Sequence, residues 1–225
     1  MSMHIDGKKV TAMYWGGLKI REAWHEGQRV FSGKPVEVMP PTPGTYDARD
    51  WLRAKLTEYG EDYWTVEELP FEIDSRQVTT MREMFRDCSS LTAVPPMDTS
   101  RVTTMFAMFG GCSSLTTVSP MDTSRVTDMS SMFEGCSSLT TVPALDTSRV
   151  TDMSSMFDVC SSLTTVPDMN THNVTNVSYM FYSCSSLTDG NVRLIGKHRR
   201  VDTFGMIDDS GLTREPFYDS SGQPI

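Results

Sequence analysis

Five cysteines are the first residues in this 225-residue sequence that could do chemistry. They stand at positions 88, 112, 136, 160 and 184, so the same interval separates each cysteine from the next. A zinc site needs close pairs of Cys or His, such as two cysteines separated by two residues, and the sequence has none. Stacked repeats could bring neighbouring thiols within disulfide reach, but five is an odd number and a reducing cytoplasm disfavours the bond. We therefore expect a buried column of free thiols without a metal.

Three aspartates repeat at the same interval. Asp98, Asp122 and Asp146 would stack into a column of carboxylates, which is a candidate calcium site. Each of them precedes a turn, however, where a side-chain oxygen can accept hydrogen bonds from backbone amides and needs no ion. We favour this structural role and expect no metal.

No set of residues predicts an enzyme. The four histidines are scattered without a paired acid or nucleophile, and most serines belong to a repeated Cys-Ser-Ser phrase. A Gly-rich phosphate-binding loop is also missing from the sequence. We therefore expect no catalytic residues and no cofactor.

These positions are parts of one 24-residue unit that occurs five times between residues 73 and 192. In every copy Met-Phe precedes the cysteine and Ser-Ser-Leu-Thr follows it. In one copy Val150, Met153 and Phe157 lie on one helical face, and the preceding Asp-Thr-Ser supplies N-cap residues. Gly135 is placed to end the helix of the copy before, and residues 139–142 are compatible with a β-strand. Stacked copies would bury these apolar residues against one another, which predicts an α/β solenoid of five coils, each with a short helix and a short parallel strand.

Composition limits the partners of such a chain. Lys and Arg number 20 against 29 Asp and Glu, so the net charge of −9 argues against nucleic acid and against anionic membrane surfaces. No run of about 18 apolar residues would span a bilayer. The N-terminal residues show neither an apolar core nor a cleavage site, so we expect no signal peptide and synthesis in the cytoplasm.

The repeat resembles the BspA-type leucine-rich repeats of bacterial surface proteins. The stretch from Leu145 to Phe157 reads LDTSRVTDMSSMF, and Cys160-Ser161-Ser162-Leu163 follows it. This phrase is characteristic of that family and recurs five times in register over residues 73–192. The resemblance implies a leucine-rich-repeat solenoid.

The flanking segments divide into four parts. Residues 1–33 alternate in short β-like pieces around glycines and predict a small hairpin module, followed by a proline-rich linker over 34–44. Helical spacing within 47–59 and a degenerate half-repeat before residue 73 predict an N-terminal cap over 45–72. Residues 193–225 would form a C-terminal cap, with Phe204 covering the last coil, and a mobile tail.

The flanks are also similar to minor tail proteins of phages that infect actinobacteria. The similarity lies in residues 9–17 (KVTAMYWGG), Trp24, residues 28–31 (QRVF) and residues 211–218 (GLTREPFY). It implies a virion protein that attaches to the tail through its N-terminus, with Tyr14, Trp15, Trp24 and Phe31 as attachment residues. A virion component leaves the cell by lysis and needs no signal peptide.

Residues that vary between copies are candidates for binding. One position reads Arg82, Phe106, Ser130, Ser154, Ser178; the next reads Glu83, Ala107, Ser131, Ser155, Tyr179; a third reads Arg86, Gly110, Glu134, Asp158, Tyr182. The aromatic side chains among them, Phe106, Tyr179 and Tyr182, are candidates for contact with a sugar or a protein. Thr117, Thr141 and Thr165 would form a flat row of hydroxyls. The alternative is that the tyrosines pack against the cap and the threonines are solvated β surface.

Together these features predict a non-enzymatic phage tail protein whose solenoid is an adhesion or interaction surface toward the host. Its partners would be other tail proteins and a host-surface glycan or protein, and a homo-oligomer in the virion is left open. The alternatives are a bacterial cell-surface adhesin and a purely structural virion decoration protein.

Overall fold

The computed structural model describes residues 34–41, 48–196 and 201–225, together with the backbone of six short strands between residues 4 and 31. These six strands pair as three antiparallel hairpins: β1 (His4–Ile5) with β2 (Lys8–Lys9), β3 (Met13–Trp15) with β4 (Leu18–Ile20), and β5 (Ala23–His25) with β6 (Gln28–Phe31). The side chains of the predicted attachment residues Tyr14, Trp15, Trp24 and Phe31 lie outside the described residues.

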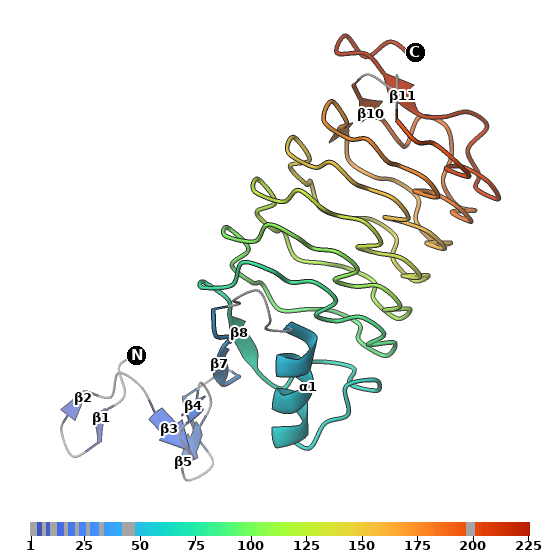
Figure 1. The fold of residues 1–225 in the computed structure, drawn as a ribbon. Coiled ribbons are helices and arrows are strands. Elements are labelled where there is room, and N and C mark those ends of the chain that lie inside the picture. Colours follow the sequence, from blue (N-terminus) through green and yellow to red (C-terminus); the bar gives the residue numbers. More distant parts are fainter. Residues whose placement is uncertain are drawn as a thin grey trace.

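The repeats form a stack of coils that lie side by side in parallel (Figure 1). Parallel bridges join the same position of successive coils, and they run through Thr80, Thr104, Asp128, Asp152, Asn176 and Asp202. The backbone N–H groups point along the stack: Phe109 donates to the carbonyl oxygen of Met132 over 2.9 Å, and Phe133 donates to that of Met156 over 2.9 Å. Each coil is thus hydrogen-bonded to the coils on both sides.

The core of the stack is built from identical side chains that lie on one another. The rings of Phe85, Phe109, Phe133, Phe157 and Phe181 are fully buried and nearly parallel, with neighbouring centroids 5.5, 5.4, 5.6 and 5.7 Å apart. This spacing exceeds the thickness of a ring, so the rings are stacked with an offset, which is the favourable arrangement. The repeated Val, Met, Cys and Leu positions are buried in the same way.

The short helix that we expected in each coil is not formed, and this part of the prediction was wrong. Over the described residues of the repeats the chain makes turns, with two left-handed residues in each coil, such as Ser155 at φ 53° and Val159 at φ 58°. A left-handed residue interrupts helical hydrogen bonding. The amides are instead donated to the next coil, as in Ser155 to the carbonyl oxygen of Ser178 over 2.8 Å. Gly135 does take a left-handed conformation, at φ 71°.

The expected strand of each coil is also reduced. Around residues 139–142 a single parallel bridge joins Thr141 to Thr165, and Thr164 donates its amide to the carbonyl oxygen of Thr140 over 3.0 Å. Regular parallel strands occur only near the two ends of the described stack.

The N-terminal end of the stack is covered by helix α1 (Ala48–Glu58), which buries Trp51, Leu52 and Leu56. Trp51 lies edge-on to the fully buried ring of Phe71, with 6.2 Å between the ring centroids. The degenerate half-repeat stacks as well, because Thr92 donates its amide to the carbonyl oxygen of Glu67 over 3.1 Å.

Part of the predicted proline-rich linker is structured. Strand β7 (Val36–Val38) pairs in parallel with β8 (Glu72–Asp74), and the next side chain, Met39, is fully buried. Burial alternates along these residues, since Glu37 and Met39 are buried and Val38 is exposed, which is the pattern of a strand. The linker was therefore placed wrongly at this point, since residues 36–39 extend the stack by one strand.

The C-terminal end is closed by a three-stranded parallel sheet of β9 (Met169–Asn170), β10 (Leu194–Ile195) and β11 (Phe217–Tyr218), in the order β11-β10-β9. Figure 1 shows β10 and β11 at the opposite end of the stack from α1. Residues 201–210 form a sixth, degenerate coil in which Met206 is buried, but Phe204 is 68% exposed and does not cover the last coil as expected. The tail is not a free end: Tyr218 bridges to Pro224, and Ile225 donates its amide to the carbonyl oxygen of Phe217 over 3.1 Å.

Candidate functional site

The cysteine column is structural. The Sγ atoms of Cys112, Cys136, Cys160 and Cys184 donate hydrogen bonds of 3.0 to 3.1 Å to the carbonyl oxygens of Phe85, Phe109, Phe133 and Phe157, each in the preceding coil. All five thiols are free and buried, as predicted. Burial raises the pKa of Cys88 and of Cys184 to about 12 and raises the pKa of the three others well above its usual value. A thiol that stays protonated is a donor and not a nucleophile.

The aspartate column has its oxygens occupied by the turns that follow it. In Asp98 and in Asp122, Oδ1 accepts hydrogen bonds from the backbone amide and from the hydroxyl of the serine two residues later, and in Asp146 it accepts the amide of Ser148 over 2.9 Å. The serine hydroxyls, followed by the amides, lower the pKa of all three carboxyl groups. Among the described residues, no group of three His, Cys, Asp or Glu side chains lies together as a metal site would require.

The predicted threonine row lies on the surface. Thr117, Thr141 and Thr165 are all exposed, and the bridge between Thr141 and Thr165 places these two side by side. The hydroxyl of Thr165 donates to the carbonyl oxygen of Asn191 over 3.3 Å. This hydroxyl therefore joins two neighbouring coils and is already hydrogen-bonded within the chain.

The predicted aromatic residues fall into two separate places. Phe106, near the N-terminal end, is partly buried under Arg82, whose guanidinium carbon lies 3.9 Å from the centroid of the ring. The same guanidinium forms an ion pair of 3.2 Å with Glu83. Two coils lie between the coil of Phe106 and the coil of Tyr179 and Tyr182, so the structure does not bring Phe106 together with the tyrosines.

Tyr179, Tyr182 and Phe204 form a cluster near the C-terminal end, which we call the aromatic patch. Tyr179 is in edge-to-face contact with both neighbours, at centroid distances of 5.8 Å to Tyr182 and 5.3 Å to Phe204. Phe204 was missed as a surface residue because the repeat interval lengthens there: the bridge from Asn176 to Asp202 spans more of the chain than the bridges before it. Aligned with that shift, Phe204 occupies the position of Ser178 and Phe106 in earlier coils.

Gly205 supplies the space that the aromatic patch needs. It has a left-handed φ of 63°, and a Cβ atom built on it would lie 2.7 Å from the ring of Tyr179. Every earlier coil has a side chain at this position. The ring of Tyr179 therefore rests directly on the backbone of the last coil.

Carboxylates lie next to the aromatic patch. Asp158 and Asp208 occupy the position of Tyr182 in the coils before and after it, and Asp202 accepts the amide of Phe204 over 3.1 Å. Burial, and next the nearby charge of Glu134, raise the pKa of Asp158 to about 6. Its Oδ1 atom is buried and has no hydrogen-bond partner in the part of the chain that the structure describes. The sequence showed that the position of Asp158 varies between copies, but it did not show the burial that raises the pKa of Asp158.

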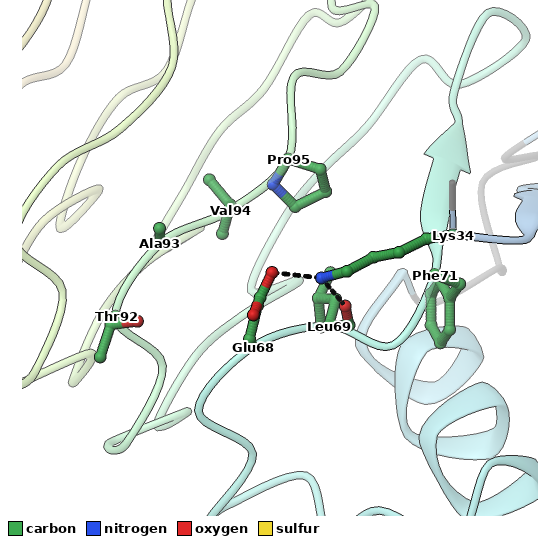
Figure 2. Close-up of a pocket in the computed structure, with 8 residues that line it drawn as sticks. All are labelled: Lys34, Glu68, Leu69, Phe71, Thr92, Ala93, Val94 and Pro95. Atoms are coloured by element: carbon green, nitrogen blue, oxygen red, sulfur yellow. Dashed lines mark hydrogen bonds and ion pairs between the residues drawn. The ribbon is translucent and has the colours of Figure 1, made fainter. Parts of the chain in front are cut away.

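A groove of about 190 Å³ lies at the seam between the N-terminal cap and the first coil (Figure 2). The side chain of Lys34 crosses it, pairs with Glu68 and donates to the carbonyl oxygen of Leu69 over 2.7 Å. Phe71 and the residues from Thr92 to Pro95 complete its walls. The amine of Lys34 is bound within the chain, so the groove is a packing seam rather than a reactive site.

The described residues contain no helix that is long and apolar enough to cross a membrane.

Comparison with known proteins identifies one family. No curated protein and no solved structure matches the chain significantly. One family profile matches twice, over residues 63–141 and 114–193, and the family is described as "Mycoplasma protein of unknown function, DUF285". The two matches overlap and together cover the repeats, in agreement with a BspA-like repeat protein. Since the matched residues make up more than half of the chain, the protein belongs to the DUF285 family.

Proposed function

We propose that the chain is a non-enzymatic virion protein, a minor tail protein of a phage or prophage, whose N-terminal hairpins attach it to the tail and whose repeat stack is an interaction surface toward the host. The proposal rests on the resemblance of the two flanks to phage minor tail proteins, which lies in residues 9–17, Trp24, residues 28–31 and residues 211–218. The leucine-rich-repeat class of the solenoid, which the BspA-type resemblance implies, is part of the same proposal.

The geometry of the stack supports an interaction role. Every coil is hydrogen-bonded to its neighbours along the whole described stack, and the core is a continuous column of stacked side chains. Such a stack holds exposed residues of successive coils at fixed spacing, which makes a long and rigid face. The described aromatic patch lies on this surface and is bordered by carboxylates.

Labelling of purified virions with an antibody against the chain, viewed by electron microscopy, tests the proposal. Label on tails is the expected result. A chain that is absent from purified particles, also by mass spectrometry, would refute a virion role.

A second candidate is a bacterial cell-surface adhesin. It is favoured by the family match, because the description of that family names the bacterium Mycoplasma. Surface labelling of intact cells that carry no prophage would support the adhesin and not the tail protein.

A further inference from the structure

The aromatic patch contains the most exposed large apolar side chain of the described coils, Phe204. Phe204 is 68% exposed and Tyr179 is 37% exposed, whereas the phenylalanines of the repeated Met-Phe phrase are fully buried. The three rings touch edge to face, and Gly205 fixes the position of Tyr179. The patch is thus a preformed, rigid surface rather than a group of loose side chains.

The described residues of the last coil carry exposed acidic side chains beside the patch. Asp202, Asp208 and Asp209 are exposed in the same coil as Phe204, and the half-buried Asp158 lies in the coil before Tyr182. Within the described range, no cation stacks on Phe204, Tyr179 or Tyr182. The face of an aromatic ring carries partial negative charge, so exposed rings beside exposed carboxylates favour a cationic partner and disfavour an anionic one.

An earlier pair of coils shows a cation stacked on the equivalent ring. Phe106 occupies the position of Phe204 in an earlier coil, and the guanidinium of Arg82 lies 3.9 Å above its ring. A carboxylate, Glu83, holds that guanidinium from the side at 3.2 Å. At the C-terminal end Ser178 stands at the position of Arg82 and Tyr179 at that of Glu83, so the ring has neither this cation nor this carboxylate. The carboxylates of the last coil lie at other positions, Asp202 and Asp208.

We propose that the aromatic patch binds an arginine side chain of a partner protein, with the guanidinium stacked on the exposed ring of Phe204 and hydrogen-bonded to Asp202 or Asp208. This inference rests on the proposed function, since it names the part of the stack that contacts the host. The partner is a basic segment of a host-surface protein. Arginine is preferred to lysine because its planar, weakly hydrated guanidinium stacks on rings and bonds to carboxylates at the same time.

Titration of the full chain with two matched peptides tests this. The probe is acetyl-Gly-Arg-Gly-Gly-Arg-Gly-amide, and the control has citrulline at both arginines, which keeps the shape and removes the charge. Calorimetry or NMR at low ionic strength should show the arginine peptide binding at least fivefold more tightly. Equal binding of the two peptides, or no binding of the arginine peptide at millimolar concentration, would overturn the inference.

Variants locate the site. Phe204→Ala and Asp202→Asn with Asp208→Asn should each weaken binding of the arginine peptide at least fivefold. Phe106→Ala, at the same position in an earlier coil, is the matched control and should leave the affinity unchanged. Thermal unfolding of each variant checks that the stack is intact.

The inference can fail while the proposed function holds. If the wild-type chain binds host cells and Phe204→Ala binds them equally well, the solenoid is adhesive through another surface. If the chain is absent from virions and the arginine peptide still binds at the patch, the site stands and the tail assignment falls.

Discussion

The thiol of Cys136 donates a hydrogen bond to the backbone carbonyl oxygen of Phe109, which lies in the preceding coil, over 3.1 Å. The same carbonyl oxygen accepts the amide of Cys112 over 3.0 Å. The thiols of Cys112, Cys136, Cys160 and Cys184 therefore each join their own coil to a turn of the preceding coil, at the residue whose ring belongs to the phenylalanine stack. This explains why Cys and Phe recur together in the repeat, since they form one joint between coils.

The thiols should be unreactive in the folded chain. Only the thiolate is nucleophilic, and burial raises the pKa of these groups far above the pH of an alkylation assay, to about 12 for Cys88 and Cys184. Iodoacetamide at pH 8 should label none of the five buried thiols within minutes in buffer and all five in denaturant, as counted by mass spectrometry. Rapid labelling of the folded chain would contradict the buried column.

Much of the stack could be predicted from the sequence, because the residues that build its core recur at a constant interval. The constant interval between the cysteines predicted which side chains lie over one another, and the apolar residues of the phrase are indeed buried. The helix was wrongly predicted because turns can also bring Val150, Met153 and Phe157 to the core. What decides between helix and turn is hydrogen bonding to the next coil, which a local pattern does not contain.

The left-handed positions illustrate the same limit. Glycine signals such a position at 111 and 135, but the equivalent residue of the next coil is Val159, at φ 58°. The aromatic patch was found only in part, since the longer interval before the last coil hides the equivalence of Phe204 with Phe106. Sequence alone also does not show the burial that raises the pKa of Asp158.

Gly135 and Val159 occupy the same left-handed position in successive coils, and exchanging glycine for valine or valine for glycine there should change the free energy of unfolding in opposite directions. A left-handed conformation costs a residue with a Cβ atom about 1–2 kcal/mol, and glycine avoids most of this cost. Val159→Gly should therefore raise the free energy of unfolding by about 1 kcal/mol, after the greater backbone entropy of glycine is counted. The reverse change, Gly135→Val, should lower it by a similar amount, since the nearest atom to an added Cβ, 3.6 Å away, leaves room for it. Urea titration measures both, and a destabilised Val159→Gly would contradict the assignment of strain.

Asp158 should lower stability at neutral pH. Its folded pKa of about 6 lies above the ordinary value of 3.8, so the ionised group penalises the folded state above pH 6 and the penalty disappears as pH falls below 4. Glu134 of the preceding coil is the charged group that faces it, and the buried thiols of Cys160 and Cys184 stay neutral. Solvent screening of a half-buried group reduces the expected effect to about 1 kcal/mol.

The variant Asp158→Asn isolates this effect. It should be more stable than the wild-type chain at pH 7 and equally stable at pH 4, by urea titration at both values. Asp122→Asn is the control of opposite sign, because hydrogen bonds to Ser124 lower the pKa of Asp122 and its stabilising effect is lost as pH falls. A constant difference between Asp158→Asn and wild type across this range would argue against a raised pKa.

The folded tail should limit self-association. Its turn is held by Asp219, whose carboxylate accepts the amides of Ser221 and Gln223, and it covers β11 through the bridge of Tyr218 to Pro224. An uncovered strand edge is a template for another chain. The average molecular mass of a chain ending at Tyr218 should therefore rise more steeply with protein concentration than that of the full chain, as measured by analytical ultracentrifugation. Identical behaviour of both chains would show that the tail does not protect an edge.

Competition for adsorption tests the central claim most directly. Host cells are incubated with the purified full chain, and adsorption of the phage that encodes it is then counted as free particles over time. An interaction surface on the solenoid predicts that adsorption slows by at least tenfold at saturating chain, with an unrelated acidic protein as the control. Adsorption at the uncompeted rate, with no chain bound to the cells, would contradict the account.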